Sequence, residues 1–451
     1  MAEPQDSATI VFEDLSTGLM VQYEGGLHEQ FAHNGGSTTN RWFKPNKTRL
    51  TGKTYNIKNE TKPMAASRVS NDLFATFPTP RAYTIGEYNI DIDETSGDND
   101  LHRVATSIRV SHVDIMRAKN NPHEIVPLVQ KLRRDALTDV DNSIAMHRWL
   151  DTNSTMATVD GDPVQNDTFF YGTSAAHTNQ TSCRAKITSG SISYFTDGQV
   201  IDVYNSGGTS DFTSVNVLDV NAVDNSIAIT HTADVANITT GDTLHLSGEY
   251  GNSLISMGEW WGGETTIYGV NRATAGNRWM IPTRTRVGET AIPYDPTMLN
   301  DAARALRHIR DENGGYVMFT SPEIMNDVIE KADEKTIIQQ PTSNTNGPFA
   351  TYGFQGFVYY HPSFGKIALE SDPFCKQGII RLIRVGDWGS IWGTTEQFEW
   401  LPGALGGIWE RLQFSTTSVQ KGMFYEANGY VTMCDWCKAP RRQLDILNIS
   451  Q

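Results

Sequence analysis

Residues 121–150 read NPHEIVPLVQKLRRDALTDVDNSIAMHRWL, and this stretch predicts one long amphipathic helix. Asn121 can cap the helix, Pro122 suits its first turn, and Glu124 stands three residues after the cap. Apolar side chains then recur at spacings of three and four, at Ile125, Val129, Leu132, Ala136, Val140 and Ile144, while the charged residues fall mostly elsewhere around the helix. Unless Pro127 shortens its start, the helix would be about 45 Å long at about 1.5 Å per residue. That is a long strut for a compact domain.

Strands are predicted on both sides of this helix. Before it, the apolar residues alternate in two runs, which predicts a pair of strands: Tyr88, Ile90 and Ile92, then Val104, Thr106, Ile108 and Val110. After it, residues 187–251 hold short β runs at 200–204, 215–220, 227–230 and 244–246, separated by turn signals such as Asp197-Gly198. This pattern is typical of a small antiparallel barrel or sandwich. No Lys or Arg occurs from residue 187 to 271, and helical material flanks the region, so we interpret it as an insertion.

From Tyr294 onward the pattern indicates a compact α/β unit. Helices are expected after Asp295-Pro296 and Ser321-Pro322, where a capping side chain precedes a proline. Strands are expected at 316–319, 357–360, 366–369 and 379–383, and aromatic-rich β structure continues to the end. Taken with the preceding elements, the chain is predicted to be of the α+β class.

Charge is spread unevenly along the chain. Its 451 residues carry a formal net charge of −15, which makes it a poor candidate for wrapping nucleic acid tightly. Residues 41–70 nevertheless hold eight basic side chains and one acidic one, with prolines and glycine and no helical period. This segment predicts an extended loop that its own domain does not stabilise and that lies across another copy of the chain, because opposite charges steer association. The alternative is a solvated basic loop with no partner. The candidate interface residues are Arg41, Trp42, Lys44, Lys47, Arg49, Lys53, Lys58, Lys62 and Arg68.

Motifs of catalysis and cofactor binding are missing from the sequence. It has no Walker-type phosphate loop, no Gly-x-Gly-x-x-Gly, no Gly-x-Ser-x-Gly and no His-Glu-x-x-His. Cys434 and Cys437 form a Cys-x-x-Cys motif, but a zinc site would need two more ligands, such as the distant Cys183 and Cys375. Two apolar-facing thiols on a strand are the favoured interpretation. No catalytic residue, cofactor or metal is therefore predicted.

The tryptophans and the ends of the chain add two expectations. Tryptophans such as Trp260, Trp261 and Trp388 could stack on sugars, although core packing is the commoner role. The sequence shows no signal peptide and no apolar run long enough to span a bilayer, so no membrane association and a reducing compartment are expected.

The order of these elements resembles that of the major capsid proteins of tailed double-stranded DNA phages, which have the Hong-Kong-97-like fold. The stretches that carry the resemblance are 103–111 with 128–150, the Gly-x-x-Arg segment at 267–272, residues 294–322, and the C-terminal stretches 424–428 and 444–447. The resemblance implies an N-terminal arm (1–40), an extended loop (41–82), a peripheral domain of strands and spine helix (83–186), an inserted β domain (187–251), a peripheral return segment (252–292), an axial domain (293–385) and a C-terminal β return (386–451).

The resemblance also implies the function and the partners. The chain would be a non-enzymatic subunit that assembles with itself, as hexamers and pentamers, into an icosahedral head holding double-stranded DNA in the virion. A separate scaffolding protein is expected, because no long helical scaffold segment is seen at the N-terminus, as are a portal protein, weak contact with the packaged DNA and room for a decoration protein. Two alternatives stay open: a carbohydrate-active enzyme with a β module, and a tail or decoration protein.

Overall fold

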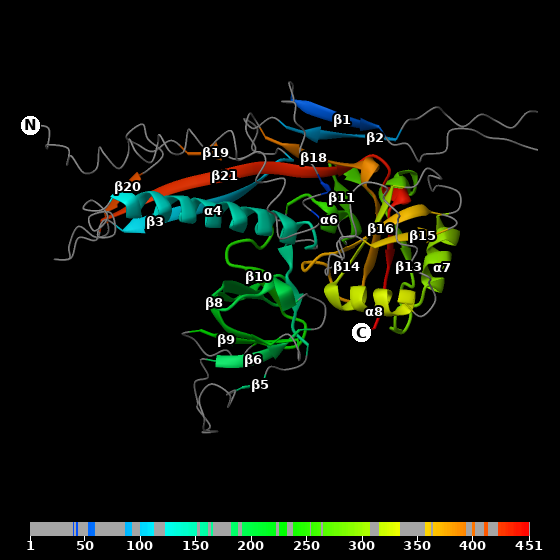
Figure 1. Cartoon of the computed structure of the whole chain (residues 1–451), viewed down its shortest axis with the longest axis horizontal. Helices are drawn as coiled ribbons and strands as arrows, with labels where there is room; N and C mark the ends of the chain where they lie inside the picture. The colour runs from blue at the N-terminus through cyan, green and yellow to red at the C-terminus, as the bar shows by residue number, and fades with distance from the viewer. Residues whose placement is uncertain are drawn as a thin grey trace, which may run out of the picture. The chain divides into compact units, whose positions relative to one another are not determined.

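The chain forms two compact units, each built from separate stretches of sequence (Figure 1). The first unit comprises residues 1–51, 101–146 and 390–434, and the second comprises residues 52–100, 147–389 and 435–451. The computed structural model describes residues 39, 42–43, 53–58, 86–92, 100–111, 122–150, 154–160, 164–165, 182–187, 192–221, 225–231, 238–252, 254–262, 265–306, 315–333, 357–361, 364–393, 399–401, 410–413 and 423–450.

A long strand organises the sheet of the first unit. Strand β21 (Met423–Cys437) pairs antiparallel with β3 (His102–Ser111), with partners running from Phe424 opposite Ser111 to Met433 opposite His102. Strands β18 (Trp388–Trp392), β19 (Glu399–Trp400) and β20 (Glu410–Gln413) also pair with β21. Along β3 the residues alternate, with Ile108 and Val110 buried and Arg109 exposed, as their period of two predicts.

The predicted long helix is present as α4 (Pro122–His147), which runs lengthwise with β3 and β21 in Figure 1. It begins at Pro122, continues through Pro127, and ends three residues before Leu150. Its buried residues include Ala136, Val140 and Ile144, which confirms the second half of the expected stripe, and Leu137 is buried as well. Leu132 is half-buried, and the side chains of Ile125 and Val129 lie outside the described residues. The charged residues depart from expectation, because Arg133 and Asp141 are only 7% and 6% exposed. Spacing by four places both of them on one line with Leu137, at the edge of the buried face.

The two strands predicted before the helix exist, but they do not pair with each other. Strand β2 (Glu87–Asp91) pairs with β1 (Thr54–Lys58) in a separate two-stranded sheet, whereas β3 pairs with β21. Alternation of apolar residues fixes which face of a strand is buried, and it carries no information about which strand lies alongside.

The second unit contains a mixed six-stranded sheet with two helices packed against it (Figure 1). The strand order is β13 (Thr283–Thr285), β22 (Leu444–Ile446), β17 (Ile380–Arg384), β14 (Tyr316–Thr320), β16 (Gly365–Ser371) and β15 (Phe357–His361). Helix α7 (Thr297–Ala305) buries Leu299, Ala302 and Ala303, and helix α8 (Pro322–Asp333) buries Ile324 and Val328. The Thr297 N–H donates to Asp295 Oδ1 at 2.7 Å, so the predicted start of the first helix is confirmed.

The second unit also contains an antiparallel seven-stranded sheet. Its order is β4 (Ala157–Thr158), β10 (Thr243–Leu246), β7 (Val200–Tyr204), β8 (Ser210–Asn221), β9 (Ser226–Thr230), β6 (Ser182–Lys186) and β5 (Val164–Gln165). The four strands predicted within 187–251 are all present, and the sheet is wider than that range. Arg184 joins it from upstream and forms an ion pair with Asp219 at 2.9 Å, so the sheet is less purely acidic than the run from 187 suggests.

Specific contacts hold this sheet to the rest of its unit. In the short helix η2 (Ile192–Tyr194), the Tyr194 hydroxyl donates to the Phe374 carbonyl at 2.7 Å, and the two rings stack with centroids 6.3 Å apart. The Gln377 side chain donates to Asn225 Oδ1 at 3.4 Å. The segment around the seven-stranded sheet is therefore held to the loop between β16 and β17.

Short elements complete the second unit. They are α6 (Met257–Trp261), β11 (Thr266–Ile267), β12 (Val270–Asn271), η4 (Ala275–Met280), η5 (Val385–Asp387) and η6 (Pro440–Arg442). Tyr268 and Gly269 both have positive φ, as a two-residue hairpin turn between β11 and β12 requires. Within the described part of the chain, no helix is both long and apolar enough to cross a membrane.

Helix α6 packs closely against backbone at Gly258, where an added Cβ would overlap the Leu150 carbonyl oxygen. We expect Gly258→Ala to lower the free energy of unfolding by about 2–3 kcal/mol, since backbone cannot move aside as a side chain can. Gly276→Ala is the matched control, because no atom lies within 4 Å of its Cβ position. Denaturant unfolding checks both variants, and equal stabilities would contradict the tight packing of α6.

Candidate interaction site at the basic segment

The described strand of the basic segment forms one side of an amphipathic two-stranded ribbon. In β1 and β2, Tyr55 pairs with Ile90 and Ile57 with Tyr88, and these four side chains share one face. Ile57, Tyr88 and Ile90 are each less than 5% exposed. The opposite, exposed face carries Thr54, Asn56, Lys58, Glu87 and Asn89. Across it, Asn56 Nδ2 donates to Asn89 Oδ1 at 2.8 Å.

Tyr88 fastens the apolar face of the ribbon to the end of β21. Its hydroxyl donates to the Cys437 carbonyl at 2.8 Å and accepts from the Cys437 N–H at 3.0 Å. Its ring stacks on that of Tyr268, with centroids 5.3 Å apart, and lies 5.8 Å from Trp260. Tyr55 adds a ring contact with Trp436 at 6.1 Å. The ribbon is therefore held by both hydrogen bonds and aromatic packing.

A buried ion pair lies close to this attachment along the chain. Arg148 donates to Asp435 through Nε at 2.8 Å and Nη2 at 3.2 Å, with the two side chains 1% and 0% exposed. The backbone carbonyl of Asp435 accepts from the Tyr268 hydroxyl at 2.6 Å, and its N–H donates to Ile255. Paired and hydrogen-bonded in this way, the charges act as structural fasteners.

A second buried pair joins the C-terminal strand to the tryptophans. Arg381 forms a two-point contact with Asp445 at 2.8 and 2.9 Å, and its guanidinium lies over the rings of Trp261 and Trp149. Trp261 and Trp388 stack with centroids 5.8 Å apart. These tryptophans are packed inside the unit, so the sugar-stacking interpretation gains no support from them.

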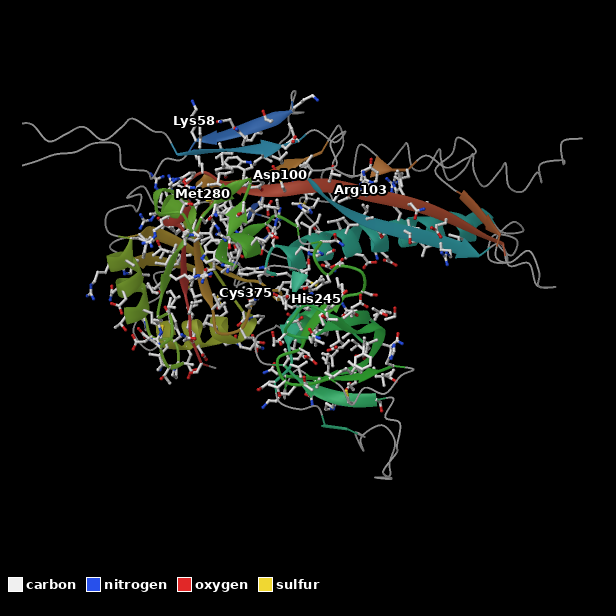
Figure 2. All side chains as sticks on the ribbon, turned by 180° about the vertical axis from the view of Figure 1, so that it is seen from behind. Lys58, Asp100, Arg103, His245, Met280 and Cys375 are labelled. Atoms are coloured by element: carbon white, nitrogen blue, oxygen red, sulfur yellow. The ribbon has the colours of Figure 1, made fainter. Side chains whose placement is uncertain are left out.

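The structure places three of the nine predicted interface residues. Lys53 and Lys58 are exposed at the two ends of β1, and Trp42 is half-buried. Figure 2 labels Lys58 on the ribbon, where it stands opposite Glu87 in the register. Arg41, Lys44, Lys47, Arg49, Lys62 and Arg68 lie outside the described residues.

The expectation that the basic segment has no place on its own chain is wrong for residues 53–58. Thr54, Asn56 and Lys58 alternate with Tyr55 and Ile57, and these two share the apolar face formed with β2. Hydrogen bonding to β2 and burial of Ile57 stabilise this part of the segment within its own unit. The residues that fasten it, Tyr88 and Tyr268, were not singled out from the sequence as site residues. Only the alternation of β2 marked Tyr88 as inward-facing.

All four cysteines lie in the described part of the chain, where they are buried and form no disulfide. Cys434 and Cys437 lie on β21 with no exposed area, as favoured from the sequence. Burial raises the pKa of Cys183 to about 12 and the pKa of Cys375 and Cys437 well above the usual value of a thiol. Among the residues that the structure describes, no group of three or more His, Cys, Asp or Glu side chains is arranged to hold a metal ion.

Comparisons with known proteins find likenesses in structure alone. No family model and no curated protein matches the sequence. Similar solved structures include the capsid asymmetric unit of cyanophage A-1(L), with 10% identity, 90% of each chain covered and a TM-score of 0.45. The procapsid of satellite phage P4 with its size determination protein has 6% identity, 96% of this chain and 100% of that chain covered, and a TM-score of 0.37. The holo-SrpI encapsulin complex from Synechococcus elongatus has 10% identity, 89% and 84% coverage, and a TM-score of 0.32. Because these identities are at most 10% and these TM-scores are below 0.5, we base the functional proposal on the elements of the chain itself.

The attachment of the ribbon gives a prediction at Tyr88. We expect Tyr88→Phe to destabilise the chain by about 1–3 kcal/mol, because the buried N–H and carbonyl of Cys437 lose their partner. Tyr55→Phe is the control, since that ring packs on Trp436 from a half-exposed position. Urea unfolding measures the stability of both variants. A Tyr88→Phe chain as stable as the control would show that the Tyr88 hydroxyl does not hold the ribbon in place.

Burial of the thiols gives a second prediction. A reagent that attacks thiolates should label no cysteine of the native chain at pH 8 within minutes, and four after denaturation, because all four side chains are buried and the raised pKa values of Cys183, Cys375 and Cys437 keep those thiols protonated. Absorbance of the released chromophore counts the labelled thiols. Rapid labelling of the native chain would contradict this arrangement.

Proposed function

We propose that this chain is the major capsid protein of a tailed bacteriophage. It assembles with itself into the icosahedral head shell that encloses double-stranded DNA, and its place is in the virion. The observation that carries the proposal is the ribbon. Strand β1 is fixed on its own unit, while residues 59–86 leave from Lys58 and return beside it at Glu87. A loop whose two ends are fixed side by side, at Lys58 and Glu87, can extend to a neighbouring copy of the chain.

The elements fit a Hong-Kong-97-like subunit in this proposal. Helix α4, with β3 and β21, corresponds to the peripheral domain and its spine helix. The six-stranded sheet with α7 and α8 corresponds to the axial domain, and the seven-stranded sheet corresponds to the inserted domain. The sequence resemblance supports this correspondence, because the stretches that carry it fall on β3, α4, α7, β14, β21 and β22.

The charges of the ribbon support a role at an interface between copies. Its exposed face presents Lys58, and the exposed Lys53 directly precedes β1, in a segment of strongly basic sequence within a chain of net charge −15. Complementary charge increases the rate of association and fixes register more than it adds affinity. The nine candidate residues named from the sequence, Lys53 and Lys58 among them, are thus proposed as contacts to a neighbouring subunit.

Further partners belong to the same proposal. Hexamers and pentamers of this chain would close the shell with a portal protein at one vertex and a separate scaffolding protein during assembly. A decoration protein on the outer surface fits this scheme. The acidic chain would touch the packaged DNA only weakly, since tight binding to phosphate needs a basic surface.

To test this proposal, the segment between β1 and β2 is shortened while the two-stranded ribbon is kept intact. Residues 60–85 are replaced by an Asn-Gly turn, so that β1 and β2 stay paired and Ile57 stays buried. We expect the wild type to form closed shells and the shortened chain to give folded subunits that form none. Sedimentation and negative-stain microscopy measure particle size, and circular dichroism checks folding.

A same-length Gly-Ser replacement of residues 232–237, in the inserted domain, is the control and should still form shells. Normal shells from the shortened chain would refute the role of the connection. A wild-type chain that stays monomeric at high concentration would refute the proposed function itself.

A further inference from the structure

A short stretch after the inserted domain presents apolar side chains to solvent. The described residues include five exposed large apolar side chains, and three of them are Ile281, Val287 and Ile292, at 40%, 65% and 41% exposure. The other two, Val200 and Leu401, lie in different elements. Exposed apolar side chains that cluster mark interaction sites more often than those that occur singly.

The turn that carries Val287 is held in a fixed, strained conformation. Arg286 has φ of 60° and Asn448 has φ of 57°, a region that L residues rarely adopt. Asn448 Nδ2 donates to the Arg286 carbonyl at 2.6 Å, so the two residues brace each other. The Arg286 side chain donates to the carbonyls of Leu447 at 3.3 Å and Thr290 at 2.9 Å. Strain of this kind persists only where surrounding contacts enforce it, and the turn held in this way leaves Val287 exposed.

Three exposed arginines lie on β13 and on the adjoining short helices η4 and η6. Arg284 lies on β13, the edge strand of the six-stranded sheet, and is exposed. Arg278 on η4 and Arg441 on η6 are also exposed, η4 packs against η6, and the Thr283 side chain of β13 donates to the Arg441 carbonyl at 2.9 Å. Figure 2 labels Met280, the last residue of η4. We call this set the Val287 surface: Arg278, Ile281, Arg284, Val287, Ile292 and Arg441.

We propose that the Val287 surface docks a second copy of this chain, with Val287 as the apolar anchor and the three arginines paired to acidic side chains of that copy. This inference rests on the proposed self-assembly and names a second contact, separate from the basic segment. A copy of this chain fits as the occupant because it is acidic overall, and its segment from residue 187 to 271 has no Lys or Arg and exposes Asp197 and Asp211. Arginine around an apolar centre is typical of protein interfaces. A DNA-binding surface would instead consist mainly of Lys and Arg side chains that contact phosphate, without exposed aliphatic side chains among them.

The test compares variants of this surface with matched variants elsewhere. Val287→Asp, and separately Arg278→Glu with Arg284→Glu, should each lower the assembled fraction at fixed concentration at least tenfold. Val200→Asp and Arg304→Glu are the controls, an exposed apolar residue and an exposed arginine outside the surface, and they should assemble as the wild type does. Sedimentation velocity measures assembly and thermal unfolding measures folding, with Val287→Ser as a milder variant if Val287→Asp fails to fold.

The outcomes separate this inference from the proposed function. If the wild type assembles and the surface variants assemble equally well, the Val287 surface is not a contact and the proposed function stands. If the variants assemble normally but bind double-stranded DNA less tightly, the surface serves nucleic acid, which also overturns the inference. A wild type that never associates overturns both.

Discussion

The buried ion pair between Arg148 and Asp435 is the constraint on which the rest of this structure depends. Arg148 follows α4 by one residue, and Asp435 lies near the end of β21, so the pair joins the chain after the long helix to the longest strand. Both charges are out of water, and removing either partner would leave the other unpaired at a cost of about 3–5 kcal/mol. Cys437, two residues further along β21, holds the ribbon through Tyr88. The anchor of the basic segment thus depends on where this pair places β21.

The second unit thus has a tightly packed interior and two exposed surfaces that this interior supports. Buried pairs, stacked tryptophans and the Tyr194 contact with Phe374 hold the second unit together from inside. The polar face of the ribbon and the Val287 surface are presented on elements that are themselves rigidly supported. Preorganised contact surfaces lose less conformational entropy on association, which favours assembly from many weak, identical contacts.

Local pattern predicted much of the fold, and long-range pairing set the rest. The stripe on α4, the buried faces of α7 and α8 and the strands β7, β8, β9 and β10 follow from periodicity and capping residues that lie within a few positions of one another. The partner of β2 could not be predicted, because the strand-forming signal of Tyr55 and Ile57 is short and lies among lysines. Arg148 and Asp435 are 287 positions apart, and no sequence pattern joins them. Of the candidate site, composition identified the basic segment, but the anchor at Tyr88 required the fold.

The most direct test of the account is a cryo-electron microscopy map of particles assembled from the purified chain. We expect a closed shell in which residues 59–85 contact a neighbouring copy while β1 stays paired with β2 of its own chain. A map in which residues 59–85 pack wholly on their own subunit, with no contact to another copy, would contradict it.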